Sequence, residues 1–375
     1  MSSELPNEED SRSLIRKEFV GPPVAARLPT PPRTKETIAE KNASVAPLNP
    51  RHWRGLAQIV GFFGLIVILI FATNAMINVG LRHITTCDFG VSNRVMTGRI
   101  NAEILITGSS RALTHYDSRV IQKITGRQTF NIGLNGSQTD MQLALFKAYL
   151  NHNVKPKLVV NNLDLFSFVT SHEIYDPAQY MPYLKEEAFY HAICRVYPDA
   201  WKWKYLPLYG YLVEDNLFKW LLGVKGFLGF QGKEDRFQGF LPRHTTWTGD
   251  FKKFRDAHPE GVKFDIEPQG VRDLTELVQI CRQQGIAIMF VYSPEYAEMQ
   301  MLERNRREIF ARFREICNRF NVPLWDYSES PLCQSRTNFY NSQHLNAEGA
   351  EAFSTDLALR LAGSGLLPPT KGGTK

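Results

Sequence analysis

The hydrophobic pattern of the chain begins with one long uncharged run. Residues 55–81, GLAQIVGFFGLIVILIFATNAMINVGL, contain no Asp, Glu, Lys or Arg, and their first two thirds are rich in Ile, Leu, Val and Phe. A membrane-spanning helix needs about 20 predominantly apolar residues. About fifty residues precede the run, and its apolar core is longer than that of a signal peptide. We therefore predict one transmembrane helix that stays in the protein.

Beyond this run, short apolar segments alternate with amphipathic ones. The pattern predicts strands at 103–109, 129–136, 156–168, 286–295 and 322–328. Apolar residues with helical spacing predict helices at 116–126, 137–153, 271–285, 305–320 and 347–363. Strands that alternate with helices are typical of βαβ units, in which helices cover both faces of a parallel sheet. We therefore predict an α/β fold with three layers, α/β/α.

The alternation stops between about 166 and 265, where the chain is rich in aromatic residues, including Trp201, Trp203 and Trp220. One interpretation is a helical insertion that caps an edge of the sheet. The other is a face that docks on the membrane or on a membrane partner, because Trp, Tyr and Lys together suit the membrane interface. Both interpretations stay open at the level of the sequence.

The distribution of charge predicts how the chain is oriented across the membrane. The net charge of +6 is spread along the chain rather than gathered in a stripe, which argues against nucleic-acid binding. Arg51, Arg54 and seven further Lys or Arg precede the apolar run, and Arg82 follows it. The positive-inside rule then places the N-terminus in the cytoplasm. We expect a bacterial inner-membrane protein with a single span and an extracytoplasmic, periplasmic C-terminal domain.

The expected domains follow directly. Residues 1–50, which contain GPPVAARLPTPPRT, form a disordered cytoplasmic arm, because they are too polar to bury a core. Residues 82–365 form the extracytoplasmic domain with its insertion at about 166–265, and residues 366–375 form a flexible tail. The five cysteines all follow the apolar run, and none has metal-type spacing. We predict no metal site and no cofactor.

Two segments carry candidate chemistry. The strand at 103–109 runs into GSSR, so that Ser110 stands at the carboxyl end of a strand, where ligands bind in such sheets. Near the C-terminus, NFYNSQHLNAEGAEAF places His344 in a loop just before the last helix. A serine nucleophile needs a base within hydrogen-bond reach, and histidine is the usual one. The pair Ser110 and His344 therefore suggests nucleophilic catalysis.

At these residues the chain resembles the SGNH (GDS-type) hydrolase superfamily. GSSR matches the block with the nucleophile through Gly108 and Ser110, and NIGLNGS is similar to the second block. FYNSQHLNAEGA is similar to the C-terminal form FYDSxHLNxxGA. The resemblance covers about residues 100–165 and 270–362. It implies a flavodoxin-like parallel sheet, an acyl-serine intermediate on Ser110, His344 as base, and an oxyanion site at Gly133 and Asn135.

The Ser at position 109 is typical of a cell-envelope branch of this superfamily. That branch includes the membrane-anchored proteins of alginate O-acetylation and lipoteichoic-acid D-alanylation. The resemblance implies an O-acyltransferase or esterase that acts on ester groups, acetyl above all, of a cell-surface polysaccharide. The implied partners are a membrane-bound O-acyltransferase or a polysaccharide synthase complex, the polysaccharide itself, and membrane lipid.

The chain departs from the family pattern in two places. The aspartate that orients the histidine is Asn341 here, and VVNNLDLF offers Asn161, Asn162 and Asp164 in place of a clear third block. An amide accepts a hydrogen bond but cannot offset the charge of an imidazolium.

Four alternatives stay open for the orienting group. Asp326 or Glu348 takes over the role, the site works slowly as a Ser–His dyad, or it is inactive. The last case would make the chain a catalytically degenerate scaffold of a polysaccharide complex. Arg111 has two interpretations: it binds an anionic polymer, or it pairs with a nearby carboxylate.

Overall fold

The computed structural model describes residues 50–213, 218–234 and 236–367. The described residues from 58 onward belong to one compact unit. The predicted arm, apart from its last residue, and all but the first two residues of the predicted tail lie outside the described residues.

A single long helix opens the described chain. Helix α1, Pro50–His83, is longer than predicted, and within it Trp53–His83 has a mean hydropathy of 2.5 over its most apolar window. In the part of the chain that the structure describes, it is the one helix long and apolar enough to cross a membrane. Its large apolar side chains are exposed up to Phe71, whereas Ile77 and Leu81 are buried. The last turns of α1 therefore pack into the protein.

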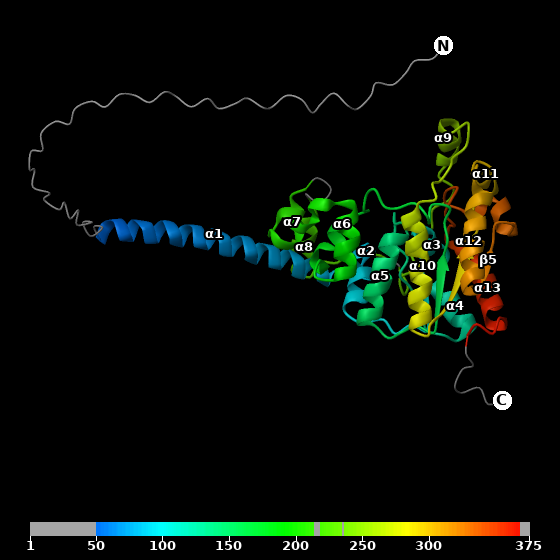
Figure 1. Cartoon of the computed structure of the whole chain (residues 1–375), viewed down its shortest axis with the longest axis horizontal. Helices are drawn as coiled ribbons and strands as arrows, with labels where there is room; N and C mark the ends of the chain where they lie inside the picture. Colours follow the sequence, from blue (N-terminus) through cyan, green and yellow to red (C-terminus); the bar gives the residue numbers. More distant parts are fainter. Residues whose placement is uncertain (1–49, 214–217, 235, 368–375) are drawn as a thin grey trace, which may run out of the picture. The chain divides into compact units, whose positions relative to one another are not determined.

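Five parallel strands form the sheet at the centre of the fold (Figure 1). They are β1 Ile104–Thr107, β2 Thr129–Asn131, β3 Leu158–Asn162, β4 Ala287–Tyr292 and β5 Leu324–Asp326. Their order is β2-β1-β3-β4-β5, which is the flavodoxin-like order that the sequence predicted. In this order the strand sequence reverses between β1 and β3, and ligands bind at the carboxyl ends beside that point.

Helices cover both faces of the sheet. On one face lie α2 Cys87–Met96, α5 Thr139–His152, α10 Pro268–Gln283 and α12 Arg306–Phe320. On the other lie α3 Ser110–His115, α4 Ser118–Thr125 and α13 Ala347–Gly363. Leu105 packs with the first group, and its neighbours Ile104 and Ile106 pack with the second. The predicted three-layer α/β/α architecture is confirmed.

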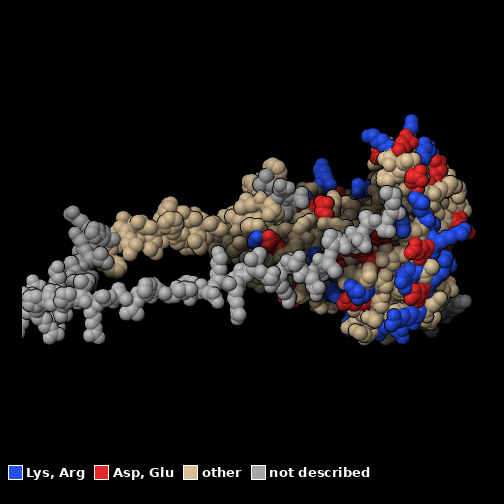
Figure 2. Space-filling model, turned by 45° about the horizontal axis from the view of Figure 1, so that its top comes forward, with Lys and Arg blue, Asp and Glu red and all other residues tan. Residues whose placement is uncertain are grey.

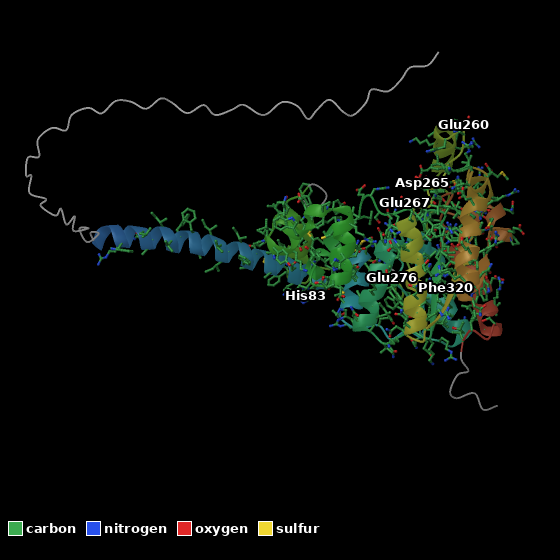
Figure 3. All side chains as sticks on the ribbon, viewed as in Figure 1. His83, Glu260, Asp265, Glu267, Glu276 and Phe320 are labelled. Atoms are coloured by element: carbon green, nitrogen blue, oxygen red, sulfur yellow. The ribbon has the colours of Figure 1, made fainter. Side chains whose placement is uncertain are left out.

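Local signals explain where several helices begin and end. Asp117 caps α4 by accepting the N–H of Arg119, and Gly126 ends that helix with φ of 67°. Asn346 caps α13 by accepting the N–H of Gly349 at 2.9 Å. On the opposite face, Lys147 of α5 lies 2.6 Å from Glu276 of α10, which Figure 3 labels.

The aromatic insertion is helical. It contains α6 Glu187–Val196, α7 Trp201–Tyr205, α8 Lys219–Phe227 and α9 Asp250–Ala257, and the short α11 Ala297–Gln300 follows β4. Helix α8 packs directly on α1: a Cβ added to Gly80 would lie 1.7 Å from the carbonyl oxygen of Gly223. The insertion thus packs against the last turns of α1 as well as against the domain that contains the sheet.

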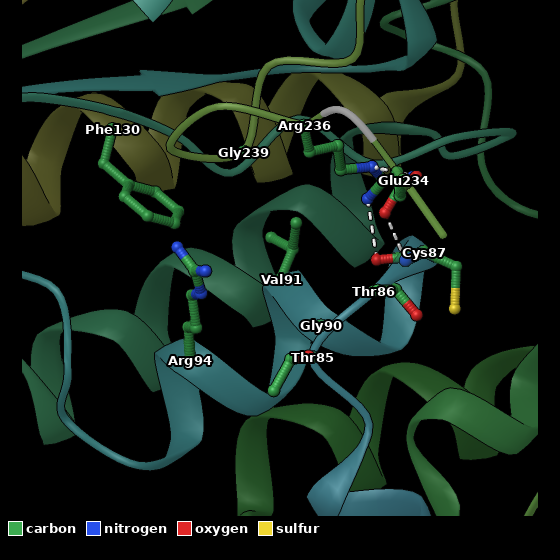
Figure 4. Close-up of a pocket in the computed structure, with 10 residues that line it drawn as sticks. All are labelled: Thr85, Thr86, Cys87, Gly90, Val91, Arg94, Phe130, Glu234, Arg236 and Gly239. Carbon is green, nitrogen blue, oxygen red and sulfur yellow. Dashed lines mark hydrogen bonds and ion pairs between the residues drawn. The ribbon is translucent and has the colours of Figure 1, made fainter. Parts of the chain in front are cut away.

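A hollow of about 220 Å³ lies where α2 begins (Figure 4). Arg236, between α8 and α9 in the insertion, donates to the carbonyl of Cys87 and to Asp88, both at 2.8 Å. Glu234 accepts the N–H of Cys87, a residue with φ of 52°. These contacts hold the segment that follows α8 against the first residues of α2. All five cysteines are free, and Cys281, Cys317 and Cys333 are buried.

Candidate active site

The nucleophile candidate stands on a tight turn between β1 and α3. Gly108 has φ of 137°, and a Cβ there would lie 2.9 Å from the Cβ atoms of Ala112 and Asn162. Ser109 caps α3 by accepting the N–H of Arg111 at 3.2 Å. The turn therefore presents Ser110, the first residue of α3, at the carboxyl end of β1 beside the switch point of the sheet.

Ser110, His344 and Asn341 form one chain of hydrogen bonds. Ser110 Oγ lies 2.8 Å from His344 Nε2, and His344 Nδ1 lies 2.9 Å from Asn341 Oδ1. Asn341 Oδ1 also accepts the backbone N–H groups of Gln343 and His344, at 3.1 and 3.0 Å.

These contacts determine the histidine tautomer. The two backbone donors require an oxygen from Asn341, and an amide oxygen only accepts hydrogen bonds. The imidazole must therefore donate from Nδ1, which leaves the lone pair of Nε2 for the hydroxyl of Ser110. This is the tautomer that a general base needs.

The surroundings of His344 keep it neutral. Its ring stacks on Tyr340 with centroids 5.3 Å apart, and the guanidinium of Arg243 lies over the Tyr340 ring at 5.6 Å. Burial, followed by the positive charges of Arg111 and Arg243, lowers the pKa of the His344 imidazole to about 3. Among the described residues, no carboxylate contacts His344 to oppose these effects.

The two carboxylates considered as substitute orienters do not fill that role. Asp326 accepts the N–H of Ser328 at 2.9 Å at the end of β5. Since β3 and β4 separate β5 from β1, Asp326 is roughly 14 Å away across the sheet from the strand that presents Ser110. Glu348 is exposed on α13. His344 precedes the cap of that helix, so the two residues do not share a helical face.

The backbone of Gly133 does not fit the predicted oxyanion role, and the role of Asn135 stays a prediction. The N–H of Gly133 donates to Asn131 Oδ1 at 2.8 Å, so it is not available to a substrate. Gly133 is a glycine for another reason: a Cβ there would lie 2.5 Å from the backbone nitrogen of Leu113. Leu134 donates to the carbonyl of Gly108 at 2.9 Å, which holds this loop beside the nucleophile turn. Half-buried Asn135 has no hydrogen-bond partner among the described residues.

The two asparagines that stand in place of the family's third block, Asn161 and Asn162, have a structural role. Asn161 Oδ1 accepts the hydroxyl of Thr107 at 2.8 Å, and Asn162 Oδ1 accepts that of Tyr116 at the same distance. Both side chains lie on the buried strand β3 and brace its neighbours. Neither presents a free amide to the site.

Arg111 forms a buried ion pair. Its guanidinium lies 3.4 Å from Asp164, and the two side chains are 4% and 1% exposed. The same guanidinium lies 4.5 Å from the centroid of the Tyr292 ring and donates to the carbonyl of Ser293. Pairing with a carboxylate is therefore the correct interpretation of Arg111, because no surface is left for a polymer.

No family model and no curated protein matches the sequence. Several solved structures, by contrast, match the structure of this chain. A GDSL-like lipase from Bacteroides thetaiotaomicron matches with 10% identity and a TM-score of 0.35, covering 73% of this chain and 100% of that one. An acylhydrolase candidate from Bacteroides fragilis matches with 13% identity and a TM-score of 0.33, covering 69% and 87%. A platelet-activating-factor candidate from Streptococcus pneumonia matches with 11% identity and a TM-score of 0.36, covering 81% and 96%.

The structure adds residues that the sequence analysis did not single out. His115 is buried; its Nε2 accepts the N–H of Leu345 at 3.0 Å, and its Nδ1 lies 2.8 Å from Ser293 Oγ. It thereby ties the histidine loop to α3 and to the end of β4. Tyr340 and Arg243 belong to the same group through their contacts with His344. The one sequence signal was the position of Tyr340 within the FYNSQH motif.

A cavity of about 430 Å³ opens beside the histidine loop. Its lining includes Arg243, Trp247 and Arg336, and it reaches the first residues of α13. The N–H of Ala347 donates to the carbonyl of Arg243 at 2.8 Å, so the cavity wall is joined to the loop that carries His344. Within the described residues, no three His, Cys, Asp or Glu side chains gather in a way that could hold a metal ion.

Proposed function

We propose that this protein is a membrane-anchored acyltransferase or esterase that forms an acyl-serine on Ser110. One observation carries the proposal: Ser110 Oγ lies 2.8 Å from His344 Nε2 while Asn341 holds Nδ1 at 2.9 Å. A serine hydroxyl, a neutral imidazole in the base tautomer and a group that orients it are what nucleophilic acyl transfer requires.

The first half of the reaction follows from this geometry. His344 Nε2 takes the hydroxyl proton of Ser110 as Oγ attacks the carbonyl carbon of an ester. The C–O bond to the leaving alcohol then breaks, and that oxygen takes the proton from Nε2. The products are an acyl-serine and a free alcohol. In the second half an acceptor hydroxyl, or water, repeats the sequence and frees Ser110.

The oxyanion that forms during attack needs hydrogen-bond donors. Asn135 supplies an unpaired side-chain amide on the loop beside the nucleophile turn. The N–H of Ser110 supplies a second donor, since the N–H groups in the first turn of a helix have no partner within it. Gly133 has no part in this proposal, because its N–H is already bound.

The proposed substrate is an acetylated cell-surface polysaccharide. The cavity at Arg243 and Trp247 offers an aromatic face, the hydroxyls of Thr245 and Thr246, and two arginines against the single carboxylate of Glu348. Those groups suit a sugar chain that carries hydroxyls and acidic groups. With α1 in the bacterial inner membrane and the N-terminus in the cytoplasm, the domain works outside the cytoplasm. It then acts beside a membrane-bound O-acyltransferase or a polysaccharide synthase complex.

A second candidate function is supported by the environment of His344. An imidazole with a pKa of about 3 and an amide for an orienting partner is poorly stabilised once it takes a proton. A chain that had kept the fold and lost the chemistry would have this site. In that case the protein is a scaffold of the polysaccharide complex, and the side chains of Ser110 and His344 serve only packing.

Replacement of Ser110 separates the two candidates. In Ser110→Ala we expect no labelling by a serine-directed phosphonate and no acylation of the polysaccharide, with the fold intact. Ser364→Ala, an exposed serine at the end of α13, is the matched control and should label and acylate like the parent protein. If Ser110→Ala and His344→Ala both leave acylation unchanged, the acyltransferase is excluded and the scaffold stands.

A further inference from the structure

A groove runs beside the last turns of α1, away from Ser110. Its volume is about 470 Å³. One wall is α1 itself, from Phe71 to Arg82, and the other walls come from residues 181–185 and 203–211 of the insertion. Among the described residues, three cations line it and no Asp or Glu does; the cations are Arg82, Lys185 and Lys204. The groove is therefore built for a negative group.

Two asparagines on α1 point to the same conclusion. Asn74 Oδ1 accepts the N–H of Leu208 at 2.9 Å, and Asn78 Oδ1 accepts the hydroxyl of Tyr211 at 2.6 Å. Both oxygens are thus occupied, and neither side-chain NH₂ has a partner among the described residues. Polar side chains on a membrane helix are costly and are usually there for a function. Here they present N–H donors to the groove.

The three cations of the groove differ in whether their charged groups already have partners. Arg82 donates to the carbonyl of Pro182 and lies 5.3 Å from the centroid of the Tyr183 ring. Lys204 lies 3.6 Å from Glu187 and 3.9 Å from the centroid of the Tyr190 ring. Lys185 is exposed and has no partner among the described residues.

The surroundings place the groove at the level of a membrane surface. Outside α1, fourteen large hydrophobic side chains are exposed in the described chain, and ten of them belong to the described part of residues 201–230. Trp201, Tyr205, Trp220 and Phe227 are among these ten; Lys202 follows Trp201, and Lys225 lies between Trp220 and Phe227 in sequence. Aromatic rings mixed with lysines are typical of the zone where protein meets lipid headgroups. Figure 2 shows charged side chains gathered over the body around the sheet, while α1 is almost uncharged.

We propose that this groove binds the phosphate of an anionic membrane phospholipid. Arg82, Lys185 and the NH₂ groups of Asn74 and Asn78 hold the phosphate, and an acyl chain lies along the exposed face of α1 at Phe71. The proposal rests on α1 lying in the membrane, which is part of the proposed function. It does not depend on acyl transfer, so a lipid measurement tests it apart from the chemistry at Ser110.

Lipid retention on the full chain is the direct measurement. The protein is purified in mixed micelles that contain equal amounts of phosphatidylglycerol and phosphatidylcholine, and native mass spectrometry counts the lipids that stay bound. We expect the parent protein to retain phosphatidylglycerol in preference. Lys185→Gln should reduce that retention about fivefold, because it removes a charged group that contacts the phosphate directly in the groove. Asn78→Asp should reduce it as well, because it keeps the acceptor for Tyr211 while it removes the donor.

Lys225→Gln is the matched control, since it removes an exposed, unpaired charge from α8 outside the groove. It should leave retention nearly unchanged. An equal loss in Lys225→Gln would mean a general attraction of charges and would overturn the groove as a site. So would equal retention of the two lipids, or full retention in Lys185→Gln. Displacement of the lipid by inorganic phosphate would make the groove a site for free phosphate, and the lipid proposal would be wrong.

Discussion

Asn341 shows which functions of an orienting aspartate an amide can perform. Its oxygen accepts three hydrogen bonds, from the backbone of Gln343 and from the backbone and ring of His344. The amide thus sets the position and tautomer of the ring as a carboxylate would. It contributes no negative charge, so the imidazolium formed during the reaction is not offset. In an unrelated serine protease, the same exchange of Asp for Asn lowers kcat about 10⁴-fold.

We predict that Asn341→Asp raises kcat. The carboxylate should raise the pKa of His344, because a nearby negative charge favours the protonated imidazole. A stronger base with a stabilised charge should react at least about tenfold faster. The measurement is hydrolysis of an activated acetyl ester by the full chain. Asn318→Asp, which adds the same charge on an exposed part of α12, is the control.

For the proposed acyl transfer, the pH profile of the parent protein is a separate prediction from the same residue. The reaction needs neutral His344, and a group with a pKa of about 3 stays neutral at every pH well above that value. The rate should therefore be flat from neutral pH down to about pH 4, whereas Asn341→Asp should lose activity at a higher pH. An acid limb near pH 6.5 in the parent protein would contradict this environment for the base.

Arg111 and Asp164 form a pair whose members depend on each other. Arg111→Met leaves the buried carboxylate of Asp164 without its partner, and breaking a buried pair in this way costs about 3–5 kcal/mol. The double variant Arg111→Met/Asp164→Leu should recover most of that loss in free energy of unfolding, measured with denaturant in detergent. Lys202→Met breaks an exposed pair with Asp199 and should change little. If the double variant is no more stable than Arg111→Met, the pair is not coupled.

At the scale of elements, α1 and α8 meet with their backbones in close contact. Gly80 and Gly226 approach so closely that a Cβ on Gly226 would lie 2.2 Å from the carbonyl oxygen of Gly80. Small residues at such a contact let two helix backbones meet.

We predict that Gly80→Ala loosens α8 from α1. Since the new Cβ would meet backbone atoms of α8, the helices must separate, and overpacking of this kind costs about 1–3 kcal/mol. Trypsin should then cut at Lys225 faster, and the thermal midpoint should fall. Gly64→Ala is the control, because a Cβ there meets nothing within 4 Å. Equal cleavage rates in the two variants would show that the contact does not hold α8.

Most of the elements, but not all of their limits, could be predicted from the sequence. Periodicity gave the sheet and the main helices, since buried parallel strands and amphipathic helices differ in spacing. The strand predicted at 129–136 ends at Asn131, because that side chain binds the N–H of Gly133 and turns the chain. Helix α2 was not predicted. Its few apolar residues carry no clear period.

The candidate site was predictable where a motif is local and not where it depends on partners far apart. Ser110 and His344 stand in recognisable motifs, and the structure brings them together. The roles of Asn161 and Asp326 could not be derived, because each depends on the order of the strands. Arg111 looked available in the sequence, whereas tertiary packing buries it against Asp164.

For the molecule as a whole, the membrane topology is a prediction that stands apart from catalysis. With α1 as the span and the N-terminal positive charges in the cytoplasm, the C-terminus lies outside it. Alkaline phosphatase fused after Lys375 should therefore be active, while the same enzyme fused before Met1 should not be. The protein should also stay in the membrane fraction after alkaline carbonate extraction. Activity of the N-terminal fusion alone would reverse the orientation.

The junction between α1 and the domain determines how the active site can meet its substrate. Three residues separate α1 from α2, and Asn93 of α2 donates to the carbonyls of Leu81 and Ile84 at 2.7 Å. With α8 also packed against α1, the connection between α1 and the domain is rigid and is not a flexible linker. If α1 spans a membrane as proposed, Ser110 is held at one height above the bilayer and in one direction around the axis of α1. On the proposed function, a polysaccharide would have to pass that fixed position, and one residue added within α1 would rotate the domain about the helix axis by about 100°.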